Sequence, residues 1–231
     1  MRVLAAVHSH DGLPFVFGDV VRELGHELVE WRPPDGPAPD GADAAIVLGG
    51  AMHVDQEDAH PWLRAEKRWI DRLLADETPV LGVCLGAELL ALGAGWPVVR
   101  LPVPEIGWHE TQLTAGGLAD PLLGGVPSRF PAFQWHSYAA DPPAGDAVLA
   151  TGASCAQAYR VGERAWGIQF HAEVNRAAVE LWLDGGSHRE DARAAELDLG
   201  AVRERTAREI GGWNELGRGL CARFLDLAAA A

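Results

Sequence analysis

The residue with the clearest capacity for chemistry in this 231-residue chain is Cys84, which stands where an apolar run meets a helical pattern. Residues 79–90 read PVLGVCLGAELL, with one glycine two residues before the cysteine and another two residues after it. A nucleophile on a sharp strand-to-helix turn needs such small neighbours, and the helix N-terminus favours a thiolate. The segment therefore predicts a nucleophile elbow. A buried cysteine at a glycine-flanked strand end is the alternative, because this glycine spacing is common by chance.

A histidine and a carboxylate two residues apart form a second candidate motif. Residues 165–173 read AWGIQFHAE, and Gln169, His171 and Glu173 alternate with apolar residues, as on one face of a strand. Glu173 can then bond one imidazole nitrogen of His171 and leave the other to act on a thiol. A surface strand end is the alternative reading, but the separate cysteine elbow favours the catalytic one.

Two glycines end a third apolar run, in which residues 46–53 read IVLGGAMH. Because Gly49 and Gly50 have no side chains, a backbone N–H can approach a substrate closely and donate to an oxyanion. A glycine pair after a strand is more often an ordinary turn.

These motifs require a scaffold of alternating strands and helices in the first half of the chain. Strands are expected at 3–7, 26–31, 43–48 and 79–83, and helices at 15–24, 61–75 and 85–92. Alternation of this kind predicts βαβ units and a parallel sheet, and wholly apolar strands predict helices on both faces. In the helix at 61–75, the buried face is expected to carry Trp62, Ala65, Trp69 and Leu73.

The second half is expected to extend the sheet and then become helical. From 98 to about 168 the turns are dense in Gly and Pro, and short strands are expected at 111–114, 133–136, 147–151 and 157–160. A helix at 175–183 and a flexible link at 185–190 follow. One or two amphipathic helices are expected over about 192–227, broken near Gly211 and Gly212.

Composition excludes several classes of function. The chain has 33 acidic and 19 basic residues, a net charge of -14, which argues against nucleic acids and anionic membranes as partners. No apolar run is long enough to span a membrane, and three cysteines cannot form a disulfide framework, so a cytoplasmic protein is predicted. The histidine-rich segments 8–11 and 53–60 lack the spacing of a known metal site, and neither a metal nor a cofactor is expected.

The three motifs, in this order, resemble the class I (triad) glutamine amidotransferase family over nearly the whole chain. The likeness is to free-standing members similar to the GMP synthase amidotransferase domain. It extends to His8 and to residues 22–27, 105–108, 133–136 and 155–160. The resemblance implies a flavodoxin-like three-layer α/β/α fold with a mostly parallel central sheet, a β-rich insertion and C-terminal helices. It implies one amidotransferase-like domain over 1–185, with a helical extension at 186–231 packed on it.

The resemblance also implies a role for each motif residue. Cys84 would be the nucleophile, His171 the general base and acid, and Glu173 the residue that orients it. Gly50 and Leu85 would supply the oxyanion N–H groups. Substrate binding would fall to Gly49, Glu88, His136, Ser137 and Tyr138. The implied reaction cleaves a γ-glutamyl amide, such as glutamine to glutamate and ammonia, through a thioester on the cysteine.

Three positions depart from the family pattern. Glu88 replaces the usual Gln four residues after the cysteine, and its carboxylate is expected to alter substrate preference or repel a free α-carboxylate. Ala172 replaces the usual Pro between His171 and Glu173, which is expected to loosen that loop. Tyr138 stands where many relatives similar to GMP synthase carry Asp.

Rival functions remain open at this stage. A stand-alone γ-glutamyl peptidase or hydrolase is the close rival, and a non-catalytic regulatory module of the same fold is a third hypothesis. The protease- or chaperone-like branch of the fold ranks low, because Leu85 rather than His follows the cysteine. If ammonia passes to a second reaction, a partner synthetase must receive it, and its docking surface should be neutral or basic. The substrate, the partner and the oligomeric state are not indicated.

Overall fold

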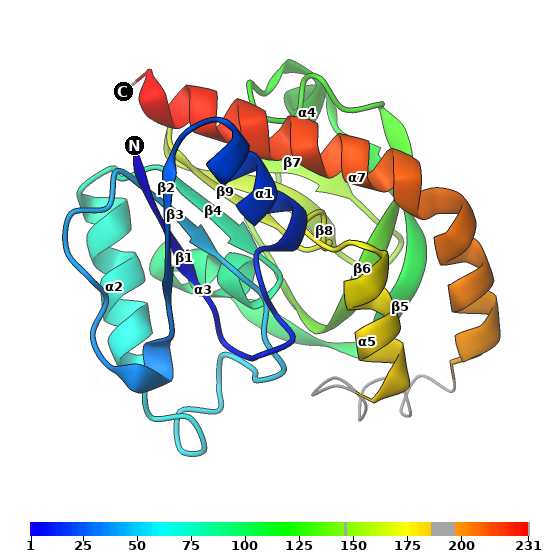
Figure 1. Cartoon of the computed structure of the whole chain (residues 1–231), viewed down its shortest axis with the longest axis horizontal. Helices are drawn as coiled ribbons and strands as arrows, with labels where there is room; N and C mark the ends of the chain where they lie inside the picture. Colours follow the sequence, from blue (N-terminus) through cyan, green and yellow to red (C-terminus); the bar gives the residue numbers. More distant parts are fainter. Residues whose placement is uncertain (146, 186–196, 231) are drawn as a thin grey trace.

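A single nine-stranded sheet organises the chain (Figure 1). The computed structural model describes residues 1–145, 147–185 and 197–230. The parallel half of the sheet consists of β1 (Arg2–Ala6), β2 (Glu27–Trp31), β3 (Ala44–Val47), β4 (Val80–Val83) and β9 (Ala165–Ile168). The antiparallel half consists of β5 (Val98–Leu113), β6 (Arg129–Ala140), β7 (Val148–Thr151) and β8 (Ala156–Val161). The strand order is β2-β1-β3-β4-β9-β8-β7-β5-β6, so the expected β-rich insertion does extend the sheet.

Helices cover both faces of this sheet. The principal helices are α1 (Phe15–Glu23), α2 (Leu63–Ala75), α3 (Leu85–Gly93), α5 (Arg176–Asp184) and α7 (Leu199–Ala229). A short helix, α4 (Ala115–Ala119), and a 3₁₀ turn, η1 (Pro33–Asp35), complete the described elements. Helices α2 and α3 pack on one face, whereas α1, α5 and α7 lie on the other (Figure 1). The fold is the expected flavodoxin-like three-layer α/β/α arrangement.

Strand β1 shows why its residues are apolar throughout. Val3 and Ala5 belong to the core cluster under α1 and α7, whereas Leu4 and Ala6 belong to the cluster under α2 and α3. Successive side chains of a strand point to opposite faces, so a strand covered on both sides needs an uninterrupted apolar run.

The buried face of α2 differs from the expected one. Ala65 is exposed, and the buried positions are Leu63, Glu66, Trp69, Ile70 and Leu73. Trp69 and Leu73 are buried as expected, but Leu63 and Glu66 are buried in place of Trp62 and Ala65, which brings a carboxyl group into the core. Because a charged group is rarely buried without a partner, Glu66 is expected to contact a polar side chain in the interior.

The insertion contains longer strands than the four short ones expected. Strand β5 has 16 residues and β6 has 12, and the two pair along most of their length. The register shifts between Arg100 and Glu105, which is where Pro102 and Pro104 lie. A proline cannot donate to a strand ladder, so the irregularity accommodates both prolines without ending the strand.

The expected break near Gly211 and Gly212 is wrong, because α7 runs unbroken for 31 residues. Tertiary packing outweighs the low helix propensity of the two glycines. Its buried side chains, including Trp213 and Phe224, join the larger core cluster. The expected link at 185–190 lies outside the described residues except for Gly185, which ends α5 with φ 128°.

Two glycines of α7 should respond oppositely to alanine. A Cβ at Gly217 would lie 2.1 Å from the backbone oxygen of Ala172, whereas no atom lies within 4 Å of one at Gly211. Gly217→Ala should lower the free energy of unfolding by about 1–3 kcal/mol, because backbone must move. Gly211→Ala should raise it by up to about 1 kcal/mol through helix propensity. Thermal unfolding of both variants measures this, and equal effects would contradict the packing of α7 on the 171–173 loop.

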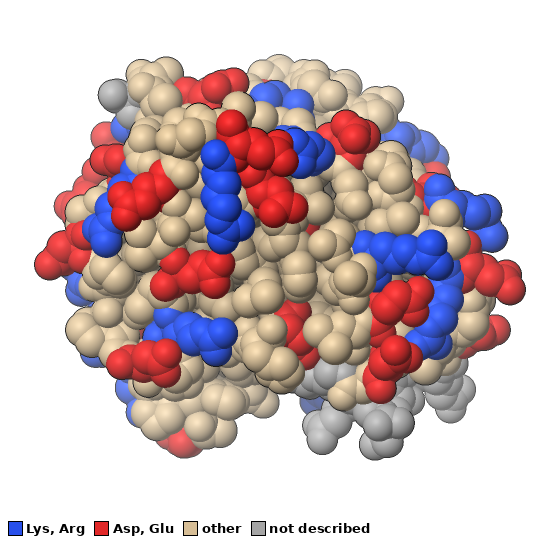
Figure 2. Space-filling view, in the orientation of Figure 1, with Lys and Arg blue, Asp and Glu red and all other residues tan. Residues whose placement is uncertain are grey.

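The surface carries both signs of charge in spite of the acidic total. In Figure 2, acidic and basic side chains alternate over the face formed by α1, α5 and α7. Arg22 lies 3.3 Å from Glu30, and Arg203 lies 2.9 Å from Glu180. This face therefore presents no continuous acidic field.

Candidate active site

Cys84 occupies a strained turn between β4 and α3. Its φ and ψ are 51° and −110°, which a residue with a side chain rarely adopts. A Cβ at Gly82 would lie 2.6 Å from the backbone of Gly86, and a Cβ at Gly86 would lie 2.0 Å from the oxygen of Val47. The glycine spacing is therefore required by backbone contact, and the elbow expected from the sequence is present.

His171 and Glu173 form a buried pair on the loop that follows β9. His171 Nδ1 lies 2.7 Å from Glu173 Oε1, and both side chains are almost fully buried. Among the described residues, His171 Nε2 has no hydrogen-bond partner. The strand ends at Ile168, so the expectation that both side chains share one strand face is wrong, although their pairing is as expected. A loop lets two residues in i, i+2 positions turn toward each other.

Gly49 is where the cysteine and the histidine meet. A Cβ at this position would lie 2.9 Å from His171 Cε1 and 3.3 Å from Cys84 Cβ. Both side chains therefore border the space that a side chain at position 49 would occupy, although they are 87 positions apart in the sequence. A glycine is required because any side chain would occupy the space between them.

The loop that carries His171 is held from both sides. Trp213 Nε1 of α7 donates to the His171 carbonyl at 2.8 Å, and Asn214 Nδ2 donates to the Val174 carbonyl at 2.8 Å. The N–H of His171 donates to the Phe133 carbonyl of β6 at 2.9 Å. These contacts fix the backbone at Ala172, where the family pattern has a proline.

Gly50 and Leu85 are the residues whose N–H groups the family resemblance assigns to an oxyanion hole. The N–H groups of Gly50 and Leu85 make no hydrogen bond among the described residues. Both residues line the pocket that contains Cys84. The pocket is also lined by Met52, His53, Glu88, Trp135, His136 and Ser137. The pocket thus combines a nucleophile with two unused donors.

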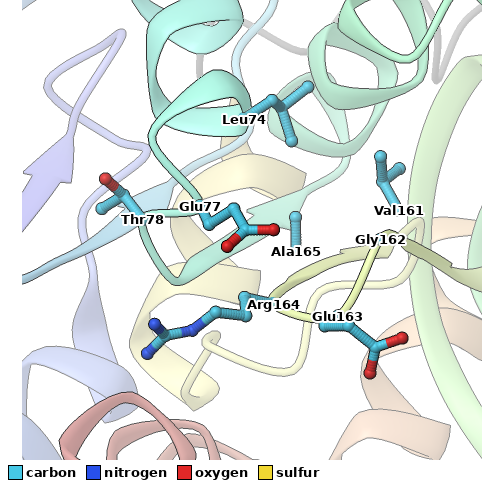
Figure 3. A pocket seen from close by; sticks show the side chains of 8 residues that line it. All are labelled: Leu74, Glu77, Thr78, Val161, Gly162, Glu163, Arg164 and Ala165. Carbon is cyan, nitrogen blue, oxygen red and sulfur yellow. The ribbon is translucent and has the colours of Figure 1, made fainter. Parts of the chain in front are cut away.

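A second, larger pocket lies at the opposite end of the central strands from Cys84 (Figure 3). Its walls come from Thr78 and neighbours before β4, and from the β8–β9 turn at residues 161–165. Strands β4 and β9 are parallel, so this pocket is at their amino ends, whereas Cys84 follows the carboxyl end of β4. Ligands of open parallel sheets bind at the carboxyl ends, which favours the smaller pocket as the site.

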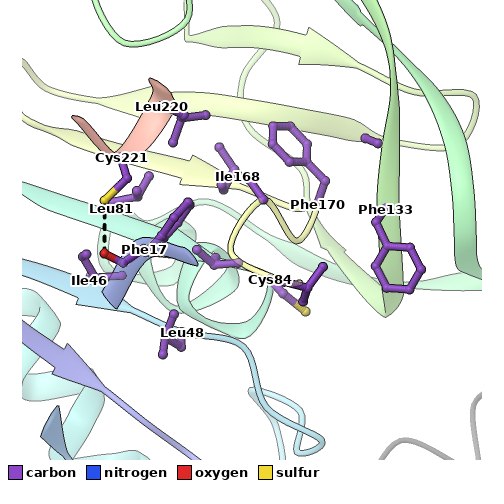
Figure 4. Close-up of a cluster of buried hydrophobic side chains, with 14 of the residues drawn as sticks. Phe17, Ile46, Leu48, Leu81, Cys84, Phe133, Ile168, Phe170, Leu220 and Cys221 are labelled. Carbon is purple, nitrogen blue, oxygen red and sulfur yellow. Dashed lines mark hydrogen bonds between the residues drawn. The ribbon is translucent and has the colours of Figure 1, made fainter. Parts of the chain in front are cut away.

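The other two thiols are held in an unreactive state. Cys84 lies at the edge of the large core cluster, while Cys221 of α7 is buried and donates to the Phe17 carbonyl of α1 (Figure 4). Burial raises the pKa of Cys221 to about 12. Burial, followed by the charge of Glu105, raises the pKa of Cys155 to about 12. Neither thiol forms appreciable thiolate at neutral pH.

Glu88 lies on the first turn of α3 and faces the pocket with 3% of its surface exposed. Gln169 Nε2 donates to its Oε1 at 3.3 Å. Burial raises the pKa of Glu88 to about 8; the hydrogen bond from Gln169 acts in the opposite direction, and the charge of Asp55 raises it further. At neutral pH this side chain is largely a neutral acid, so it can donate a proton to a hydrogen bond as a glutamine amide can.

His136 is held by two acceptors at the end of the pocket. Its Nε2 lies 3.1 Å from Glu105 Oε2, and its Nδ1 lies 2.8 Å from the Tyr138 carbonyl. Burial would raise the pKa of Glu105, but the hydrogen bonds and charge of His136, with a hydrogen bond from Ser154, lower it to about 2. The adjacent Ser137 has its Oγ buried without a hydrogen-bond partner among the described residues.

Tyr138 is directed toward the loop after β3 and not toward the interior. Its ring stacks on His53 with centroids 4.3 Å apart, and its hydroxyl donates to Asp55 Oδ2 at 3.1 Å. His53 lines the pocket, so Tyr138 contacts a residue of the pocket wall.

Glu105, Cys155 and Gln157 are site residues to which the sequence reasoning assigned no role. Gln157 Nε2 donates to Glu105 Oε2 at 2.9 Å and lies 3.3 Å from Cys155 Sγ. In the sequence, the segments 105–108 and 155–160 stand out only by their family likeness. Ligand atoms of Glu105, His136 and Cys155 lie within 4.8 Å of one another, which is the one potential metal-binding group in the described part of the chain. These groups hydrogen-bond to each other and support the His136 segment.

The chain belongs to the class I glutamine amidotransferase family, whose model matches residues 19–179. It is 40% identical over 174 residues to a glutamine-hydrolysing GMP synthase from Aeropyrum pernix, covering 71% of this chain and 32% of that protein. The match therefore spans about a third of that relative. It is 28% identical over 165 residues to a gamma-glutamyl-L-1-hydroxyisopropylamide hydrolase from Pseudomonas sp., covering 68% and 54%.

The fold has solved counterparts. A glutamine amidotransferase from Thermotoga maritima superposes with a TM-score of 0.87 and 27% identity, covering 98% of each chain. Within the described residues of this protein, no helix has the length and apolarity to cross a membrane. The structural likeness agrees with the fold class expected from the sequence.

Proposed function

We propose that the protein hydrolyses a γ-glutamyl amide through a thioester on Cys84. The thiolate attacks the side-chain carbonyl carbon, and the N–H groups of Gly50 and Leu85 stabilise the oxyanion. His171, oriented by Glu173, protonates the leaving nitrogen, so that ammonia or an amine departs as the C–N bond breaks. His171 then takes a proton from water, whose oxygen attacks the thioester and releases the free acid and the thiol.

The single observation that carries this proposal is the meeting of three catalytic parts at Gly49. A Cβ at Gly49 would meet both Cys84 and His171, and the next residue has an N–H without a hydrogen bond among the described residues. A non-catalytic module of this fold would have no need for a strained cysteine beside an oriented histidine. Strain at a single residue is kept where the surrounding structure and function require it.

Substrate binding is proposed for Gly49, Glu88, His136, Ser137 and Tyr138. Glu88 in its protonated form would donate to a substrate carboxylate or carbonyl, as an amide would. Ser137 offers a buried hydroxyl beside the nucleophile. Tyr138 would limit the size of the group that enters past His53.

A stand-alone γ-glutamyl hydrolase is the second candidate function. The specific observations in its favour are Glu88 in place of the family's glutamine and the stacking of Tyr138 on His53, which lines the pocket. A hydrolase named for a γ-glutamyl amine substrate is also among the relatives. In that case the leaving group would be an amine and not ammonia.

Turnover by the purified protein distinguishes these two functions. A glutaminase would release ammonia from glutamine with a higher kcat/KM than it releases amines from γ-glutamyl amines or peptides. A stand-alone hydrolase should show the reverse preference by at least about tenfold, since a few contacts to the leaving group are worth about 1–3 kcal/mol. Glutamate release, measured for all substrates, provides a common readout. Absence of turnover of every γ-glutamyl amide would contradict both functions.

We propose that 186–231 is an extension of the amidotransferase-like domain, which is supported by the hydrogen bond from Trp213 to the catalytic loop. If the product is ammonia, a synthetase partner would receive it, and a relative from Thermoplasma acidophilum that is named as one subunit of a glutamine-hydrolysing GMP synthase supports this. Cys84, Cys155 and Cys221 form no disulfide in the described structure, which supports a reducing, cytoplasmic location.

A further inference from the structure

A buried histidine outside the triad contacts the loop that forms the oxyanion hole. His8 follows β1, and its Nδ1 lies 3.1 Å from the carbonyl oxygen of Gly49. Its Nε2 lies 2.7 Å from Glu66 Oε1 on α2, and the side chains of His8 and Glu66 have no exposed surface. Both atoms that face the ring are acceptors, so a ring with protons on both nitrogens satisfies both contacts.

The surroundings of His8 favour this doubly protonated form. Burial by itself lowers the pKa of His8, but the charge of Glu66 and hydrogen bonds to Glu66 and to the Gly49 and Leu48 carbonyls raise it above its usual 6.5. A doubly protonated His8 beside Glu66 would form a buried ion pair. Burying two charges is costly, and a buried ion pair often contributes little to stability compared with apolar residues. A role in the site is the more economical reason for its presence.

The geometry of the peptide bond connects His8 to the oxyanion hole. The described chain has no cis peptide bond, so the carbonyl of Gly49 and the N–H of Gly50 point in opposite directions. Because His8 holds the carbonyl on one side, the N–H is directed to the other. Rotation of this peptide would be easy for two glycines in sequence. The hydrogen bond from His8 opposes that rotation.

We propose that Glu66 and His8 are positioning residues for the oxyanion hole: they anchor the Gly49 carbonyl and thereby aim the Gly50 N–H at the substrate. The inference rests on the proposed function, because it assigns a role within that reaction. The hydrogen bond donated to the Gly49 carbonyl also polarises the peptide, which makes the Gly50 N–H a stronger donor. The pair acts on the tetrahedral intermediate without touching the substrate.

A pair of conservative variants separates the two contacts of the histidine. The amide nitrogen of asparagine reaches the place of His Nδ1, and that of glutamine reaches the place of His Nε2. His8→Asn thus keeps the donor to Gly49, whereas His8→Gln keeps the contact with position 66. Both are made together with Glu66→Gln, so that neither variant leaves an unpaired buried charge. Thermal unfolding shows that each variant is folded before activity is compared.

The expected result is a difference in kcat and not in KM. With the best γ-glutamyl substrate, the kcat of His8→Gln/Glu66→Gln should be about 30-fold to 100-fold below that of the Glu66→Gln parent. This loss is somewhat smaller than the one caused by removal of an oxyanion donor. His8→Asn/Glu66→Gln should stay within about fivefold of the Glu66→Gln parent. Equal kcat values for the two folded variants would overturn the proposal. His26→Asn, outside the site, is the control and should leave kcat unchanged.

The rate at which iodoacetamide alkylates Cys84 distinguishes a role in positioning the oxyanion hole from a purely structural role. The thiolate displaces iodide and forms an S–C bond, and no oxyanion develops. The alkylation rate should therefore be equal in both double variants, while hydrolysis differs. A parallel loss of alkylation and hydrolysis would overturn the proposal, because the pair would then act through the fold or the thiolate. If the proposed function fails instead, the wild-type protein itself will hydrolyse no γ-glutamyl amide.

Discussion

Replacing Cys84 by serine should abolish γ-glutamyl amide hydrolysis, with a loss of about 10⁴-fold or more in kcat. A serine hydroxyl in the same elbow is far less nucleophilic, and the setting of His171 suits a thiol that ionises easily. The fold should be retained, since Ser is smaller than Cys and the strain at φ 51° is already accommodated. Release of glutamate from the preferred substrate measures the effect.

Labelling tests the same residue independently of turnover. A glutamine-like electrophile should modify Cys84 in the wild-type protein, while Cys155 and Cys221, with pKa values of about 12, remain unlabelled at neutral pH. Peptide mapping by mass spectrometry identifies the labelled thiol. The control is Cys221→Ser, in which serine can replace the thiol as donor to the Phe17 carbonyl. Slow, equal labelling of all three thiols, or undiminished activity of Cys84→Ser, would refute the catalytic proposal.

The parts of the site that could be predicted from the sequence are those fixed by short-range geometry. The elbow needs Gly82, Cys84 and Gly86 within five residues, because each glycine meets backbone that any side chain would strike. His171 and Glu173 are likewise two residues apart. In both cases a local geometric requirement fixes the spacing between the residues, so the sequence motif indicates the geometry.

Other parts depend on contacts between segments that lie far apart in the sequence. His8 and Glu66 are 58 positions apart, and Trp213 reaches His171 from 42 positions away. One signal was available for Glu66: it follows Trp62 by four residues, so it shares the apolar stripe of its helix. The expected stripe contains the exposed Ala65 in place of Glu66, so it does not include the buried carboxyl group.

The errors in the second half arose from local residue preferences that tertiary structure overrides. Gly211 and Gly212 predict a break, but the apolar face of α7 packs across the sheet and keeps the helix continuous. A strand is expected only from residue 111, but β5 begins at Val98 and passes Pro102 and Pro104 through an irregularity in its pairing with β6. Glycine and proline indicate a local free-energy cost for a helix or strand. The packing that offsets this cost is visible only in the folded structure.

Glu88→Gln should remove a pH dependence from both activity and stability. In the wild-type protein Glu88 is largely neutral at neutral pH and ionises near its pKa of about 8, which places a negative charge in the pocket. For a substrate with a free α-carboxylate, kcat/KM should then fall by up to about tenfold per pH unit above that pKa, because like charges repel. The glutamine variant, which stays neutral, should lack this alkaline decline.

The same ionisation predicts the sign of a stability effect. The pKa of Glu88 is raised from 4.5 in the unfolded chain to about 8 in the fold, so the folded state binds the proton more tightly. Wild-type stability should therefore fall relative to Glu88→Gln as pH rises from about 4.5 to about 8, and the difference should level off above that range. Unfolding midpoints of both proteins across this range measure it, with Glu163→Gln at the exposed β8–β9 turn as the control. If the wild-type and Glu88→Gln proteins respond to pH identically in kcat/KM and in stability, Glu88 is not the neutral acid that the pocket requires.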